Sequence, residues 1–309
     1  SLWRTLLVVA AYAFFILQSQ FFSAGIRATD RYAKGTVLMD LCTFLETLLV
    51  VLVAAMAGSI FLCFLAALIF RVCISFFLYI VLTAGHSWMS LRLQFPNIKE
   101  LQGLLHPSLG SFTLVVASGI GIQGIVVSLG ACFGPGAAAA YSVTRTVTRI
   151  PHQLSSLFAR ASIPEFTRTY TLGRTDVFRR LIVWNYLVCA AVLGLSGVFL
   201  FTFGDYVVHK LSSGQVVTEP LVLYALILAA VFIGFWYVAA SPLVSLNNYR
   251  IYPVVYLGLS ILLVCFPVVF RSEPTTFGLR FVSILTACVE LATLISVLYS
   301  VGRLLRKRR

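Results

Sequence analysis

Apolar runs of about twenty residues or more recur along the whole chain, and this feature restricts its fold more than any other. The hydrocarbon core of a bilayer is about 30 Å thick, so a helix needs roughly 20 apolar residues to cross it. Because 60% of the residues are apolar and 11% are charged, a soluble domain of this length could not bury them in one core. About nine runs have the required length, and they extend approximately over 2–24, 35–56, 60–84, 109–132, 137–159, 180–203, 220–246, 252–270 and 277–301.

Only helices fit these runs. The strands of a membrane β-barrel are about ten residues long and alternate in polarity, whereas these runs are about twice as long and do not alternate. We therefore predict an all-α fold, a polytopic transmembrane helix bundle of about nine spans. The chain begins with Ser1 inside an apolar run, with neither a basic segment nor a small-residue cleavage site, so we expect no signal peptide and expect further helices to precede Ser1.

Basic residues gather in alternate links between the runs, and this pattern predicts the orientation, because Lys and Arg mark cytoplasmic loops. The links near Ala57 and over 133–136 and 204–219 are uncharged or balanced, and the link holding Arg271, Glu273 and Arg280 departs from the alternation. The basic positions follow the first, third, fifth and seventh runs and close the chain, and they are Arg27, Arg31, Lys34, Arg92, Lys99, Arg160, Arg168, Arg174, Arg179, Arg250, Arg303, Arg306, Lys307, Arg308 and Arg309.

This pattern predicts a multi-pass protein of the inner (cytoplasmic) membrane with a cytoplasmic C-terminus. An odd number of earlier spans would restore a cytoplasmic start, and three would make a total of about twelve. The net charge of +13 lies in the juxtamembrane links and the tail, where the headgroups of membrane lipids account for it. Nucleic-acid binding is therefore not expected.

The fifth run carries the most information about function. As a helix from Ala137 it has an apolar face with Val143, Val147, Ile150, Leu154 and Leu157. The opposite face should avoid lipid, because its side chains are polar, namely Tyr141, Arg145, Thr148, Arg149, His152 and Ser156.

Two arginines on that face should lie deep in the membrane. At 1.5 Å per residue from the outer end, Arg145 is roughly 12 Å deep and Arg149 roughly 18 Å deep. Each costs roughly 2.5 to 3.5 kcal/mol there unless it meets water, an anion or an acid. Because they are one helical turn apart, both guanidinium groups can converge on one ligand, and their bidentate geometry suits a pyrophosphate. The alternative is that each pairs with a carboxylate of another span, and Pro151 should kink the helix beside them.

Three further charged residues lie inside apolar runs. Glu46 and Arg71 are both near mid-membrane on consecutive antiparallel spans, each roughly 18 to 20 Å from the end of its span, where they either pair with each other or take part in ion coupling. Glu290 lies about halfway down the last run. It is a candidate for binding a coupling proton or cation, and the alternative is that it anchors a nearby arginine.

Uncharged polar residues in the runs are expected to form interhelical hydrogen bonds or to line a cavity. They are Gln18, Gln20, Gln123 and Asn185. In the fourth run, Gly119, Gly121 and Gly124 spell G-x-G-x-x-G, but no strand precedes the pattern, so we interpret it as small residues that allow close helix contact.

Signs of catalysis are scarce. The four histidines form no H-E-x-x-H motif, and neither G-x-S-x-G nor a paired-aspartate metal motif occurs. No enzyme activity, metal or cofactor is therefore predicted.

The segment GPGAAAAYSVTRTVTRIPHQLSSLFARASIPEFTRTY, starting at Gly134, resembles the region of polysaccharide-biosynthesis flippases in which an AxYSxxRTxxRxPxQ helix runs into a cytoplasmic PE turn. The segment QSQFFSAGIRATDRYAKGT resembles the connection between two N-lobe helices of the same family, and HPSLGSF resembles the start of its first C-lobe helix.

The resemblance implies the multidrug/oligosaccharidyl-lipid/polysaccharide exporter fold, with two six-helix lobes that alternate access to a central cavity. Residues 1–94 would be the latter half of the N-lobe, with three transmembrane helices, and residues 95–309 would be the C-lobe, with six transmembrane helices and a basic cytoplasmic tail. The implied function is that of a flippase for a polyprenyl-pyrophosphate-linked oligosaccharide, with a glycan polymerase or other assembly proteins as partners.

The expected substrate-binding residues are Arg145, Arg149, Tyr141, His152 and Gln123. Two alternatives remain. One is a cation-coupled exporter of drugs or small solutes from the same superfamily, and the other is a membrane scaffold for glycan-assembly enzymes that transports nothing.

Overall fold

The computed structural model describes residues 2–28, 32–85, 97–249 and 251–306. In these ranges all regular secondary structure is helical, which confirms the predicted all-α class. Eight of the described helical segments are long and apolar enough to cross a membrane, as judged by length and composition. The chain divides into two compact units, Ser1–Phe95 and Pro96–Arg309, which are called unit 1 and unit 2 below and are described separately.

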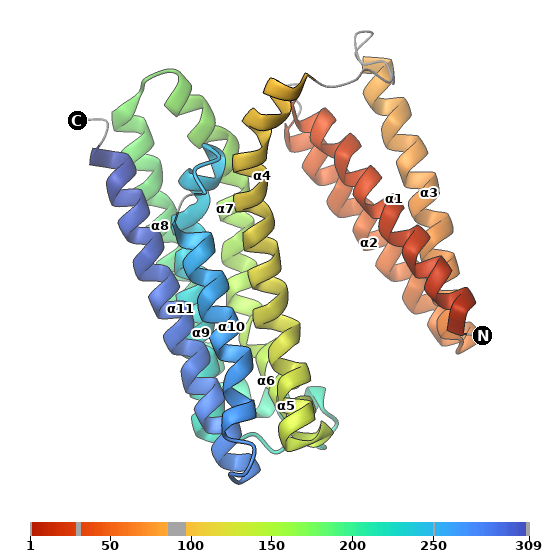
Figure 1. The fold of residues 1–309 in the computed structure, drawn as a ribbon, viewed down its shortest axis with the longest axis vertical. Coiled ribbons are helices and arrows are strands. Elements are labelled where there is room, and N and C mark those ends of the chain that lie inside the picture. Colours follow the sequence, from red (N-terminus) through yellow and green to blue (C-terminus); the bar gives the residue numbers. More distant parts are fainter. Residues whose placement is uncertain (1, 29–31, 86–96, 250, 307–309) are drawn as a thin grey trace. The chain divides into compact units, whose positions relative to one another are not determined.

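Unit 1 consists of α1 (Leu2–Ala28), α2 (Tyr32–Ala57) and α3 (Ile60–Gly85), which all pack against one another (Figure 1). The link between α2 and α3 is short, and Gly58 takes a positive φ of 58° there, which a glycine adopts without steric cost. Large apolar side chains are exposed on the outer faces of all three helices, as expected for helices that meet lipid. The core of unit 1 includes Phe22, Ile26, Ile74, Leu78 and Leu82.

Unit 2 contains the remaining helices. They are α4 (Ile98–Gly119), the π-helix η1 (Ile120–Gly124), α5 (Ile125–Phe133), α6 (Pro135–Thr148), α7 (Ile150–Thr171), α8 (Thr175–Leu211), α9 (Pro220–Ser245), α10 (Tyr252–Val269) and α11 (Thr275–Arg306). Because α4, η1 and α5 follow one another without a break, they form one long span.

Helix α9 lies at the centre of unit 2. It packs against α6, α7, α8 and α11 (Figure 1), and a larger share of it is buried than of any other candidate span among the described residues. Its sequence carries no charged residue, as is typical of a helix enclosed by other helices. Residues of α9 thus form one wall for the side chains that α6 and α11 direct inward.

The glycines of the fourth run lie where this span meets α10. A Cβ atom added to Gly124 would lie 3.0 Å from Val264 Cγ2, and one added to Gly121 would lie 3.3 Å from Ser260 Oγ. Ser128 also donates a hydrogen bond of 2.8 Å to the Val264 carbonyl. These contacts confirm that small residues allow close helix packing here, but the π-helical turn was not predicted.

The fifth run is not a single span over 137–159. Helix α6 ends at Thr148 and α7 begins at Ile150, so the helix breaks at Arg149. The break confirms the disturbance expected from Pro151, which has no N–H to donate to the Val147 carbonyl. Neither α6 nor α7 is by itself among the eight candidate spans, since α6 has 14 residues and α7 is rich in polar ones.

Two further expectations for this region were wrong. The PE turn does not form, because Pro164 and Glu165 lie inside α7, which continues to Thr171. Packing against α8 extends the helix, and the rings of Phe166 and Phe178 lie 5.4 Å apart, centroid to centroid. Val147, assigned to the lipid-facing side, is buried in a cluster with residues of α8 and α9.

Candidate functional site

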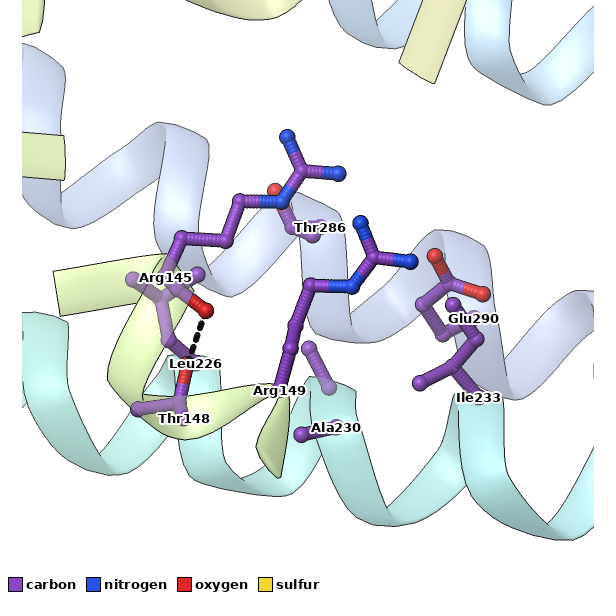
Figure 2. Close-up of a pocket in the computed structure, with 9 residues that line it drawn as sticks. Arg145, Thr148, Arg149, Leu226, Ala230, Ile233, Thr286 and Glu290 are labelled. Carbon is purple, nitrogen blue, oxygen red and sulfur yellow. Dashed lines mark hydrogen bonds between the residues drawn. The ribbon is translucent and has the colours of Figure 1, made fainter. Parts of the chain in front are cut away.

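The candidate site is a small, partly open cavity of unit 2, between α6, α9 and α11 (Figure 2). Its volume of about 20 Å³ has room for about one water molecule. Arg145, Thr148 and Arg149 line it from α6 and the break after it, and Thr286 and Glu290 line it from α11. Helix α9 supplies an apolar wall, made of Leu226, Ala229, Ala230 and Ile233.

Arg145 is oriented by backbone and by an aromatic ring. Its Nη1 donates a hydrogen bond of 2.8 Å to the carbonyl of Ile122, which belongs to η1, and its Cζ lies 5.9 Å from the centroid of the Tyr141 ring. Thr148 donates a hydrogen bond of 3.2 Å to the Arg145 carbonyl, which is the dashed line in Figure 2. A π-helical turn is a common feature of functional sites. Here it supplies the acceptor for an arginine.

Arg149 extends toward the same side of the cavity as Arg145 (Figure 2). Among the residues that the structure describes, neither guanidinium group forms an ion pair with a carboxylate, and the side chain of Arg149 makes no hydrogen bond. The described residues therefore do not show the alternative arrangement, in which each arginine pairs with an acid of another span. The cavity holds two cationic groups whose hydrogen-bonding capacity is largely unused.

Glu290 shares this cavity, but its hydrogen bond is to a tryptophan. The indole Nε1 of Trp236, on α9, donates to Glu290 Oε2 at 2.7 Å. Both residues are buried, with 3% of Trp236 and 6% of Glu290 exposed. The sequence analysis did not identify Trp236. The available signal was that a buried indole N–H needs an acceptor. That signal does not identify the acceptor, because Glu290 is 54 residues away in the chain.

Three predicted substrate-binding residues lie outside the lining of the cavity. Tyr141 is fully buried, and its hydroxyl is 3.0 Å from Thr286 Oγ1. The ring of His152 is buried edge-on against Tyr237, 5.3 Å between centroids. Gln123 is exposed on η1. Of the five predicted residues, the structure brings Arg145 and Arg149 together at the cavity.

The polar face of α6 and α7 is largely packed against protein, as expected of a face that avoids lipid. Thr148, His152 and Ser156 are buried, whereas Ile150 and Leu154 are exposed on the other side. The two arginines are only partly buried. Together with Thr148, they are the members of that face that line the cavity.

Glu46 and Arg71 belong to unit 1 and form a buried ion pair, so the pairing alternative of the sequence analysis is the one that the structure shows. The bond joins Arg71 Nη2 to Glu46 Oε2. Tyr12 adds a hydrogen bond of 2.7 Å to Glu46 Oε1, and this partner was not predicted. Nε and Nη1 of Arg71 are buried without a partner among the described residues.

Comparison with known proteins shows the fold. No protein-family model matches the chain, and no curated protein matches its sequence. Solved structures do match. The chain is similar to MATE in the bent conformation, with a TM-score of 0.80 at 16% identity over 98% of this chain and 69% of that one. It is also similar to MATE in complex with MaL6, with a TM-score of 0.79 at 17% identity over 98% and 70%.

A third similar structure is the outward-facing conformation of a multidrug resistance MATE family transporter of the MOP superfamily, with a TM-score of 0.76 at 17% identity over 99% and 70%. The chain thus has the fold of MATE transporters and is built as a multi-pass membrane protein. The expected exporter fold is confirmed. The polysaccharide branch suggested by the sequence segment is a different branch of that superfamily, and these structures do not test it.

Proposed function

We propose that the chain acts in a transmembrane transporter that exports its cargo by alternating access, and that Arg145 and Arg149 bind an anionic group of that cargo. The MATE-like fold and the eight candidate spans support a transporter. One observation supports the anionic cargo, namely two guanidinium groups at one small cavity without a carboxylate paired to either among the described residues.

The first candidate cargo is a polyprenyl-pyrophosphate-linked oligosaccharide. A pyrophosphate presents oxygens that suit two neighbouring guanidinium groups, and their charge would offset the cost of moving a diphosphate through a medium of low dielectric. The glycan would occupy the water-filled part of a central cavity, and the lipid tail would remain in the bilayer. Since the cavity holds about one water in this structure, it must widen before a diphosphate enters.

The second candidate is an exporter of drugs or small solutes coupled to a cation. The comparisons favour it over the first, because one similar structure is a multidrug resistance transporter. Glu290 supports it as well, since a buried acid is suited to a proton or a cationic solute.

The deciding experiment replaces both arginines by alanine in the complete protein, which is expressed in the native host in place of the unmodified protein. If the cargo is the lipid-linked glycan, Arg145→Ala with Arg149→Ala should reduce surface glycan assembly by about tenfold or more, because a charge-assisted bidentate contact is lost. Arg174→Ala is the matched control, since Arg174 is exposed in a link between helices and should tolerate the change.

Efflux of a cationic dye, measured in the same strains, separates the two candidates. Loss of glycan assembly with unchanged dye efflux supports the glycan cargo. A further strain carries Glu290→Gln. Dye efflux that is lost in Glu290→Gln and unchanged in the arginine variant supports the drug exporter and overturns the anionic cargo. If neither measurement responds to any of these substitutions, the transport proposal is wrong and the scaffold alternative is favoured.

A further inference from the structure

The position of Glu290 raises a question about how the arginines remain available. A carboxylate and two guanidinium groups line one small cavity, yet no nitrogen of Arg145 or Arg149 is within ion-pair distance of Glu290. Opposite charges attract strongly where water is scarce, so the acid would be expected to pair with the nearer arginine unless something else held it.

The indole of Trp236 is placed to hold the Glu290 carboxylate away from the arginines. It donates a hydrogen bond of 2.7 Å to Glu290 Oε2, which is a short distance for an N–H donor and an oxygen acceptor. The indole is itself fixed by neighbouring rings, because Tyr256 lies 5.2 Å and Tyr237 lies 6.0 Å from it, centroid to centroid. His152 packs in turn on Tyr237. A donor locked in this way can hold the carboxylate in one place.

We infer that Trp236 is a positioning residue that holds the Glu290 carboxylate out of an ion pair with Arg149 and so keeps that guanidinium group available to the cargo. The inference rests on the proposed anionic cargo. Glu290 is then an internal competitor, since its negative charge is the nearest alternative partner for Arg149 when the indole N–H is removed. A cargo must bind the Arg149 guanidinium group more strongly than the Glu290 carboxylate does. This requirement favours a diphosphate over a singly charged group.

The test measures binding of a short isoprenyl pyrophosphate to the purified complete protein by calorimetry, with the corresponding isoprenyl alcohol as the uncharged control. In Trp236→Phe the ring remains and the N–H is lost. We expect it to bind the pyrophosphate about tenfold more weakly, because Glu290 becomes free to occupy Arg149. Glu290→Gln removes the competing charge and keeps an acceptor for the indole, so it should bind about two- to tenfold more tightly than the unmodified protein.

The double variant separates positioning from packing. Trp236→Phe with Glu290→Gln should recover the tight binding of Glu290→Gln, because without the carboxylate there is nothing to restrain. If the double variant binds as weakly as Trp236→Phe, the tryptophan acts through packing and the inference is overturned. If Trp236→Phe does not fold, Glu290→Gln alone still decides, since weaker binding in that variant contradicts a competitor role.

A failure of the proposed function looks different. If the unmodified protein binds the pyrophosphate and the alcohol equally, or if Arg145→Ala with Arg149→Ala binds the pyrophosphate as the unmodified protein does, then the anionic cargo is wrong and the inference falls with it. If the arginines are required and Trp236→Phe changes nothing, only the role of Trp236 is overturned.

Discussion

At the scale of residues, the two units use their buried charges differently. In unit 1, Glu46 and Arg71 neutralise each other, and Tyr12 adds a third member to the network. In unit 2, Arg145 binds a backbone carbonyl and Glu290 binds an indole, so the charges share a space without pairing. The first arrangement suits a structural role and the second suits a binding site.

The buried pair of unit 1 gives a stability prediction. Arg71→Leu leaves Glu46 charged and unpaired in a buried place, which should cost about 3 to 5 kcal/mol of unfolding free energy. Replacing both residues by leucine should recover most of that loss, because no uncompensated charge remains. Thermal unfolding of the purified protein in detergent measures both effects. A double variant that is no more stable than Arg71→Leu would contradict a mutual role for the two charges.

The sequence predicted the charged members of the candidate site but not their partners. Arg145 and Arg149 were identifiable because arginines are rare and costly in an apolar run. The Ile122 carbonyl was not, since its availability depends on a π-helical turn that no residue pattern announces. Trp236 was overlooked within an otherwise apolar helix. Tyr141, His152 and Gln123 were predicted at the site but lie outside the lining of the cavity.

At the scale of elements, hydropathy predicted most helices within a few residues, for example 252–270 against Tyr252–Val269 for α10. It failed where tertiary packing overrides composition. Helix α7 continues through Pro164 because Phe166 packs on α8, and no run of apolar residues marks that continuation. The break at Arg149 was predictable because Pro151 has a fixed chemical consequence.

Two glycines of α4 provide a matched test of helix packing. A Cβ at Gly110 would lie 2.2 Å from Tyr249 Cβ and 3.1 Å from the Tyr249 carbonyl oxygen, so Gly110→Ala should destabilise unit 2 by about 1 to 3 kcal/mol. Gly103 has nothing within 4 Å of its added Cβ, so Gly103→Ala should be neutral or stabilising by up to about 1 kcal/mol. Chemical unfolding measures the unfolding free energy of both variants. Equal changes in the two would contradict a close contact between Gly110 and Tyr249.

At the scale of the whole molecule, the fold is that of MATE transporters over nearly all of this chain and about 70% of the similar structures. The alternation of basic links adds a prediction of orientation. One departure from that pattern has a local explanation, since Arg280 forms an ion pair with Glu219.

The orientation is testable with fusions to alkaline phosphatase, whose disulfides form only outside the cytoplasm. Fused at the C-terminus, the phosphatase should be inactive, because the basic tail is predicted to be cytoplasmic. Fused within residues 212–219, it should be active, because that link is predicted to lie on the outer side. The reverse result would invert the proposed direction of transport as well as the topology.

The central place of α9 also constrains how the protein is made. Helix α9 contacts α6, α7 and α8, which precede it in the chain, and α11, which follows it. During synthesis α6, α7 and α8 leave the ribosome before α9, and α11 leaves after it. The hydrogen bond between Trp236 of α9 and Glu290 of α11 therefore cannot form until α11 has been synthesised, so the candidate site is completed only late in synthesis.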